Sequence, residues 1–131
     1  MSPWVEGVDG SGIGEKIRIV NDDKQIFPGL SYYGFIISNG FVDFKKPYLY
    51  AFNNRVKKIR VNCGFPEEYI DFLIEDTPQL QYFFVSSKLL RVNNRMLEFE
   101  ILEVYNGSRW NDTCINFIIP LTLFFDEFEW L

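Results

Sequence analysis

Residues 57–75 have the sequence KKIRVNCGFPEEYIDFLIE, and this stretch decides the fold class. Apolar and polar residues alternate in two runs, 57–63 and 69–75, which are separated by Gly64 and Pro66. Alternation with a period of two is typical of β-strands that bury one face and expose the other. The stretch therefore predicts two consecutive antiparallel strands joined by a turn.

The rest of the chain repeats this pattern. Short β-branched or aromatic runs, each bounded by Gly, Pro, Asn or Asp, predict further strands at 16–20, 32–38, 80–86, 96–105 and 114–120, with the remnant of a first strand at 3–7. Within 96–105 the apolar phase changes after Ile101, which predicts a β-bulge or a switch between sheets. No convincing helix is found. We predict an all-β fold, an antiparallel β-sandwich.

Composition limits the organisation and the chemistry. A chain of 131 residues with 47% hydrophobic residues is predicted to form one domain, 1–131, with an aromatic and acidic C-terminal tail at 121–131. The formal charge of -5 argues against a nucleic-acid partner. The absence of histidine argues against zinc chemistry and a Ser-His triad. No apolar run is long enough to span a membrane.

Strand parity places candidate binding residues together. If consecutive strands are antiparallel, the loops 7–14, 39–55, 76–79 and 106–112 lie at one end of the sandwich, where binding residues are usually carried. Asn amides beside an aromatic ring suit sugar recognition, with Tyr48 or Trp110 stacking on the pyranose; the alternative is that the Asn residues cap the loop. The candidate ligand-binding residues are Trp4, Glu6, Asn39, Tyr48, Asn53, Asn54, Arg55, Trp110, Asn111 and Asp112.

For the charged residues in these loops and strands, plain exposure to solvent is the alternative to a binding or catalytic role. The six cations between Lys45 and Arg60 are interpreted as a solvated strand face rather than a phosphate-binding track. Glu98 and Glu100 could form a glycosidase pair, but without a pocket they are interpreted as an exposed strand face. We expect no cofactor, although the loop carboxylates could bind structural calcium or simply be solvated; they are Glu6, Asp9, Asp43 and Asp112.

Glycine and cysteine positions give two further predictions. The segment GSGIG at 10–14 is followed by a strand rather than a helix, so we interpret it as a tight turn with positive φ and not as a dinucleotide site. Cys63 and Cys114 fall at opposite ends of their strands by the parity count. Because a disulfide needs Cα atoms about 6 Å apart, we predict two unbridged, largely buried thiols.

Four segments carry a family resemblance: PWVEGVDGSGIGE (3–15), SNGF (38–41), NNRVKKI (53–59) and EILEVYNGSRWNDTCIN (100–116). Together they resemble the discoidin-like, galactose-binding-like jelly roll of the coagulation-factor C type that is associated with bacterial NAD glycohydrolases. The resemblance implies an eight-stranded jelly-roll β-sandwich, a non-catalytic module, and carriage on secreted, cell-surface or periplasmic bacterial proteins. The chain departs from the family by lacking a lead-in strand before Trp4, so it is expected to be N-terminally short of the full module.

Three functions remain open. The first is a binding module for a glycan or another cell-surface ligand. The second is a structural or protein-docking domain that uses a sheet face, or a dimer formed through the tail 121–131. The third is an enzyme, for which no pair of nucleophile and base is visible. The first ten residues contain no signal-peptide pattern, so a cytoplasmic location stays open beside the secreted one.

Overall fold

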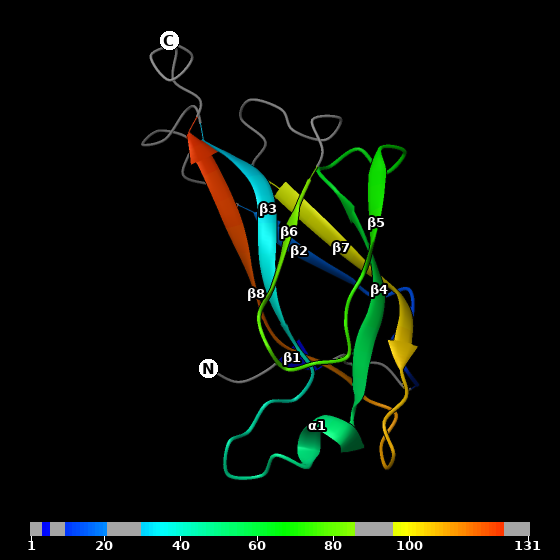
Figure 1. The fold of residues 1–131 in the computed structure, drawn as a ribbon. Coiled ribbons are helices and arrows are strands. Elements are labelled where there is room, and N and C mark those ends of the chain that lie inside the picture. Colours follow the sequence, from blue (N-terminus) through cyan, green and yellow to red (C-terminus); the bar gives the residue numbers. More distant parts are fainter. Residues whose placement is uncertain (1–3, 6–9, 21–29, 86–95, 125–131) are drawn as a thin grey trace.

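The computed structural model of the chain describes residues 4–5, 10–20, 30–85 and 96–124. Within these residues lie eight β-strands and one short helix (Figure 1). The elements in chain order are β1 (Trp4–Val5), β2 (Lys16–Val20), β3 (Leu30–Asn39), α1 (Leu49–Phe52), β4 (Asn54–Asn62), β5 (Tyr69–Leu73), β6 (Gln81–Phe84), β7 (Met96–Tyr105) and β8 (Thr113–Phe124).

The strands form two layers that share one hydrogen-bonded connection. One layer has the order β2-β7-β4-β5 and the other has the order β6-β3-β8-β1. The layers join where β4 begins, because Asn54 and Arg55 pair in parallel with Thr113 and Cys114 of β8. We call these two pairs the seam. The predicted β-sandwich is confirmed, with the correction that the seam makes the pairing mixed rather than wholly antiparallel.

Aromatic packing between the layers forms the centre of the core. Phe35 on β3 meets Phe99 on β7 edge to face, with ring centroids 5.0 Å apart, and meets Phe72 on β5 in the same way at 5.5 Å. Phe35 and Phe99 are fully buried, as are Ile59 and Val61 on β4. The alternation that predicted the strands thus also identified their buried faces.

The phase change in the 96–105 run corresponds to an irregular register, as predicted. Val56 pairs with Val104, Lys58 with Glu103 and Ile59 with Ile101. Lys57 is therefore an extra residue on β4 and Leu102 an extra residue on β7. This pair of bulges lets the apolar side chains on both sides of it face the same core.

Glu98 corrects one interpretation, because its side chain is buried rather than exposed on a strand face. The residue is 4% exposed, and its carboxylate accepts hydrogen bonds from Arg18 Nε at 2.6 Å and from Asn62 Nδ2 at 3.1 Å. These bonds, with Arg18 contributing most, hold the pKa of Glu98 below its usual value. A general acid needs a raised pKa, so this environment does not suit glycoside hydrolysis.

Several boundaries differ from the predictions. β4 begins at Asn54, three residues before the predicted strand, because the seam extends it. β8 continues to Phe124, so the first residues of the predicted tail belong to a strand, while 125–131 lie outside the described residues. The 39–55 segment contains α1, a single helical turn that the sequence did not predict.

Lys58 and Arg60 on β4 have carboxylate partners, which corrects the view of a simply solvated face. Lys58 Nζ lies 3.7 Å from Glu103, and Arg60 Nε lies 2.8 Å from Asp71. The Arg60 guanidinium also lies over the ring of Tyr69, 3.9 Å from its centroid. Neighbouring carboxylates therefore neutralise much of the basic character of this strand.

The glycine and cysteine predictions agree with the geometry. Gly10, Gly12 and Gly14 all have positive φ, as a tight turn requires. Cys63 and Cys114 form no disulfide with each other. Cys114 lies opposite Arg55, whereas Cys63 directly follows the end of β4, eight residues after Arg55 and about 26 Å from it at the rise of a strand. Cys114 is buried as expected, whereas Cys63 is half-buried. Among the described residues, no helix is long and apolar enough to cross a membrane.

Candidate functional site

Three connections come together at one end of the sandwich, next to the seam (Figure 1). They are residues 40–53, 74–80 and 106–112, and we call them the loop end. The backbone N–H groups of Ser108 and Trp110 donate to the carbonyls of Ala51 and Phe52. Tyr50 Oη donates to Asp76 at 2.8 Å. The parity count therefore placed these loops correctly.

Arg55 is the buried charge around which the loop end is organised. Its Nε donates to Asp76 Oδ1 at 3.0 Å and its Nη2 to Oδ2 at 2.8 Å. Nη1 donates to the carbonyls of Asn53 at 3.0 Å and Ala51 at 3.3 Å. The hydrogen bonds from Arg55 keep the pKa of Asp76 below its usual value. Burial, reinforced by Asp76, raises the pKa of the Tyr50 hydroxyl, which stays protonated and donates to that carboxylate. Because all three nitrogens of this guanidinium donate hydrogen bonds within the protein, Arg55 serves as structural support for the loops.

Asn54 connects the seam to the 106–112 loop. It is 1% exposed, and its Nδ2 donates to the backbone oxygen of Asn111 at 2.9 Å and to the Asn111 side chain at 3.0 Å. Its Oδ1 accepts from the backbone N–H of Gly107 at 2.6 Å. The amide therefore satisfies three polar groups of the loop while pointing inward.

Two other predicted Asn residues also serve the scaffold. Asn39 is fully buried, and its amide makes a two-point contact with the backbone of Val56, with bonds of 2.8 and 3.0 Å. Asn53 follows α1, and its Nδ2 donates to the carbonyl of Leu49 at 2.9 Å. Asn53 therefore caps α1, which is the alternative role that the sequence analysis left open for the Asn residues.

The exposed part of the loop end is aromatic. Tyr48, Phe52 and Trp110 form a row that we call the aromatic platform, with centroids 5.2 Å apart for the first pair and 5.6 Å for the second. Tyr48 is 50% exposed and Trp110 is 41% exposed. The guanidinium of Arg109 lies 5.2 Å from the Trp110 ring centroid and 5.7 Å from that of Phe52.

The platform joins predicted and unpredicted residues. Tyr48 and Trp110 were predicted site residues, and Asn111 and Asp112 lie beside Trp110 with exposed side chains. Phe52 and Arg109 belong to the same loops but were not among the candidate ligand-binding residues. Phe52 joins the platform because the helical turn of α1 places it next to Tyr48. Trp4 does not join this set, because it pairs with Ile115 and packs against the core. Glu6 lies outside the described residues.

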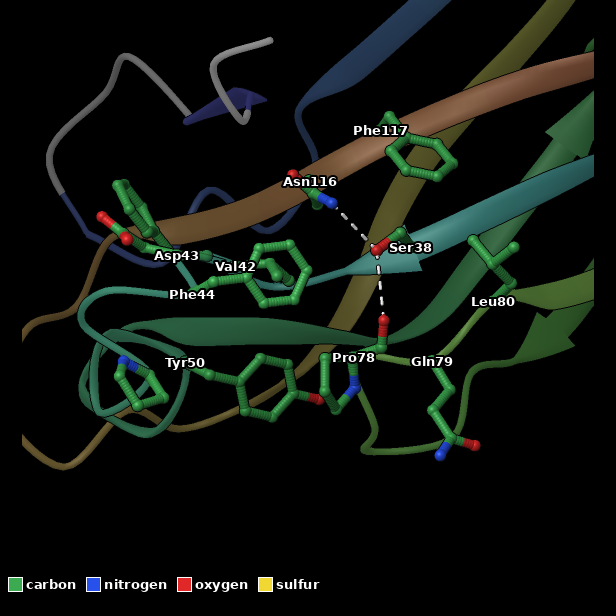
Figure 2. Close-up of a pocket in the computed structure, with 12 residues that line it drawn as sticks. Ser38, Val42, Asp43, Phe44, Tyr50, Pro78, Gln79, Leu80, Asn116 and Phe117 are labelled. Carbon is green, nitrogen blue, oxygen red and sulfur yellow. Dashed lines mark hydrogen bonds between the residues drawn. The ribbon is translucent and has the colours of Figure 1, made fainter.

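A separate cavity of about 550 Å³ lies on another side of the 40–53 loop (Figure 2). It opens between this loop and the turn at 78–80, with β3 and β8 behind it. The sequence predicted candidate ligand-binding residues on the 39–55 and 106–112 loops and did not predict this cavity. Lining residues are mostly apolar; they are Ser38, Phe41, Val42, Asp43, Phe44, Pro47, Tyr50, Pro78, Gln79, Leu80, Asn116 and Phe117.

The carboxylates considered for calcium do not gather where the structure describes them. Asp43 Oδ1 accepts hydrogen bonds from the backbone N–H groups of Lys45 at 2.9 Å and Lys46 at 3.2 Å, closing a turn. Across the described parts of the chain, no three Asp, Glu or Cys side chains come close enough to hold a metal ion. Asp9, like Glu6, lies outside those parts.

Comparison with known proteins gives one match. A family model described as the NAD glycohydrolase translocation F5/8 type C domain matches residues 1–119. No curated protein matches the chain. No solved structure matches it either.

Proposed function

Because the chain belongs to the NAD glycohydrolase translocation F5/8 type C domain family, we propose that it is a non-catalytic module that binds a glycan on a surface through the aromatic platform. The family description names the domain for the translocation of an NAD glycohydrolase, which supports a role in placing or moving a protein. The same family description also supports a secreted or cell-surface location. The agreement between this description and a loop end that presents aromatic rings is the basis of the proposal.

The observation that carries the proposal is the exposure of Tyr48 and Trp110 on a rigid base. Aromatic side chains half exposed to solvent lose contact area with water when an apolar sugar face covers them. The backbone N–H groups of Arg109 and Trp110 both donate to the Phe52 carbonyl, which fixes the 106–112 loop against α1. A platform fixed before binding has little conformational entropy left to lose.

Polar groups for sugar hydroxyls lie next to the rings. Arg109 offers guanidinium donors above Trp110. The Asn111 side-chain oxygen accepts from Asn54, so its Nδ2 group remains available as a donor on the exposed side of the loop. Asn54 and Arg55 contribute indirectly, by holding the loop that carries these donors.

A glycan array followed by titration of its strongest hit tests the proposal. Trp110→Ala and Tyr48→Ala should each weaken binding by about tenfold, equivalent to roughly 1.4 kcal/mol of lost ring contact. Tyr82→Ala is the matched control, because Tyr82 is 58% exposed on β6, away from the platform. Equal binding by all three variants would exclude the aromatic platform as the binding site, and the absence of any glycan hit would exclude the glycan-binding function.

A protein-docking function is the second candidate, and one observation favours it. β5 and β6 each pair with one strand among the described residues, and they expose Leu73 at 68%, Tyr82 at 58% and Phe84 at 61%. Exposed apolar side chains at sheet edges suit a protein partner or a second copy. Light scattering across a concentration series tests the second copy: a dimer that Phe84→Ser dissociates would favour docking over glycan binding.

A further inference from the structure

We propose that the 550 Å³ cavity between the 40–53 loop and the 78–80 turn is a second binding site, which takes one uncharged, flat aromatic molecule. This site lies apart from the aromatic platform and does not depend on glycan binding. Its volume falls in the range of pockets that enclose a small organic molecule, about 300 to 1,000 Å³.

The hydroxyl groups that line the cavity, on Ser38 and Tyr50, already have partners, which limits the polar groups that a ligand could satisfy there. Ser38 Oγ donates to the carbonyl of Pro78 at 3.2 Å and accepts from Asn116 Nδ2 at 3.1 Å (Figure 2). The Tyr50 hydroxyl is bound to Asp76. Since burying a polar group without a new partner costs free energy, a ligand rich in polar groups would gain little here.

The charges around the cavity disfavour ions of either sign. Among the described residues that line it there is no lysine or arginine, so an anionic group would meet no counter-charge from them. In the described lining the carboxylate is that of Asp43, which lies at the edge (Figure 2) and accepts hydrogen bonds from the backbone N–H groups of Lys45 and Lys46. The side-chain amide of Gln79 points away from Ser38 (Figure 2). An ammonium group inside would therefore lose its hydration without a close partner.

The walls favour a planar ring over a flexible chain. Phe41, Tyr50 and Phe117 contribute aromatic surface, and Val42, Pro78 and Leu80 contribute aliphatic surface. Aromatic side chains gain additional attraction from offset or edge-to-face contact with another ring. Pro78 and the hydrogen bond from Ser38 fix one wall, so the site is largely formed before a ligand enters.

Three naphthalene compounds that share the ring system and carry a neutral, cationic or anionic substituent at the same position test the proposal. They are 1-naphthalenemethanol, 1-naphthylmethylammonium and 1-naphthoate, each titrated by calorimetry into the whole chain. The alcohol should bind at one site, at least tenfold more tightly than either ion. Equal affinity for all three, or stronger binding of an ion, would overturn the assignment.

Matched variants locate the site. Leu80→Lys places a cation in the cavity wall and should weaken binding of the alcohol at least tenfold. Leu73→Lys makes the same change at a residue that is 68% exposed on β5 and outside the cavity, so it should change nothing. An unchanged affinity in Leu80→Lys would contradict the proposal.

Two further measurements test whether the alcohol binds in the cavity or on the aromatic platform. In the unmutated protein, adding the alcohol should shift the side-chain amide resonances of Asn116; if these do not move, the cavity is not the site. Trp110→Ala should leave the affinity for the alcohol unchanged, even if it abolishes glycan binding. Loss of alcohol binding in Trp110→Ala would place the compound on the aromatic platform and overturn the proposal.

Discussion

Arg55 and Asp76 form a two-point ion pair that ties the seam between the two layers to the 74–80 turn. Both carboxylate oxygens are used, at 3.0 and 2.8 Å, and the Arg55 side chain is 11% exposed. Bidentate pairing of this kind fixes geometry as well as charge. The loop end therefore has a defined shape before any ligand binds.

Arg55→Ala should lower the free energy of unfolding by about 2 to 4 kcal/mol, because it leaves Asp76 and two backbone carbonyls without their donor. Lys58→Ala should cost less than about 1 kcal/mol, because the pair of Lys58 with Glu103 is half exposed and 3.7 Å long. Urea denaturation of both variants measures the difference. Similar small losses in the two would show that Arg55 does not organise the loop end.

Asn54→Ala should destabilise the protein by about 2 kcal/mol, because the partly buried N–H of Gly107 and the carbonyl of Asn111 both lose a partner. Asn106→Ala is the matched control, since Asn106 is exposed in the same loop. Thermal unfolding compares the two variants. A loss in the control as large as in Asn54→Ala would contradict the role given to the buried amide.

Gly107→Ala should destabilise the fold although Gly107 does not need positive φ. A methyl group at this position would overlap the backbone of Phe52 and Asn53, which cannot move without disturbing α1. We expect a loss of at least about 2 kcal/mol, as for other sites that cannot accommodate added volume. The exposed neighbour Ser108→Ala should change stability by less than about 0.5 kcal/mol. Equal melting temperatures would disprove the close approach.

Acid stability should depend on Glu98. Its pKa is lowered in the folded state, so its contribution is complete above the unfolded pKa of about 4.3 and is lost as pH falls through the lower folded pKa. Glu98→Gln should be less stable than the unmutated protein at pH 7, and the gap should narrow below about pH 4. Thermal unfolding from pH 7 to pH 3 measures this. A gap that is constant with pH would show that the ionised carboxylate contributes nothing.

The sequence predicted the scaffold because its signal is local. Alternation along Ile59, Val61 and their neighbours specifies which faces are buried, and the two phases of the 96–105 run specify the bulge. Parity then placed the three loops at one end. These inferences need only strand geometry and the alternating direction of consecutive strands.

The candidate site was harder to predict because the role of a polar side chain depends on contacts distant in sequence. Asn39, Asn54 and Arg55 have the side chains of ligand-binding residues, yet their partners are Val56, the 106–112 loop and Asp76. Glu98 has the spacing of an exposed residue, but Asn62 and Arg18 come from neighbouring strands. The cavity was not predicted because one of its walls is the turn at 78–80, which is distant in sequence from the 40–53 loop that forms the opposite wall.

The most direct test of the glycan-binding proposal is the indole N–H resonance of Trp110 during titration with the strongest hit of the glycan array. The chain contains three tryptophans, and Trp110→Phe assigns the resonance of interest. The account predicts that the Trp110 signal shifts and saturates with the glycan while the other two indole signals stay in place. A saturating glycan that leaves the Trp110 resonance unmoved would contradict it.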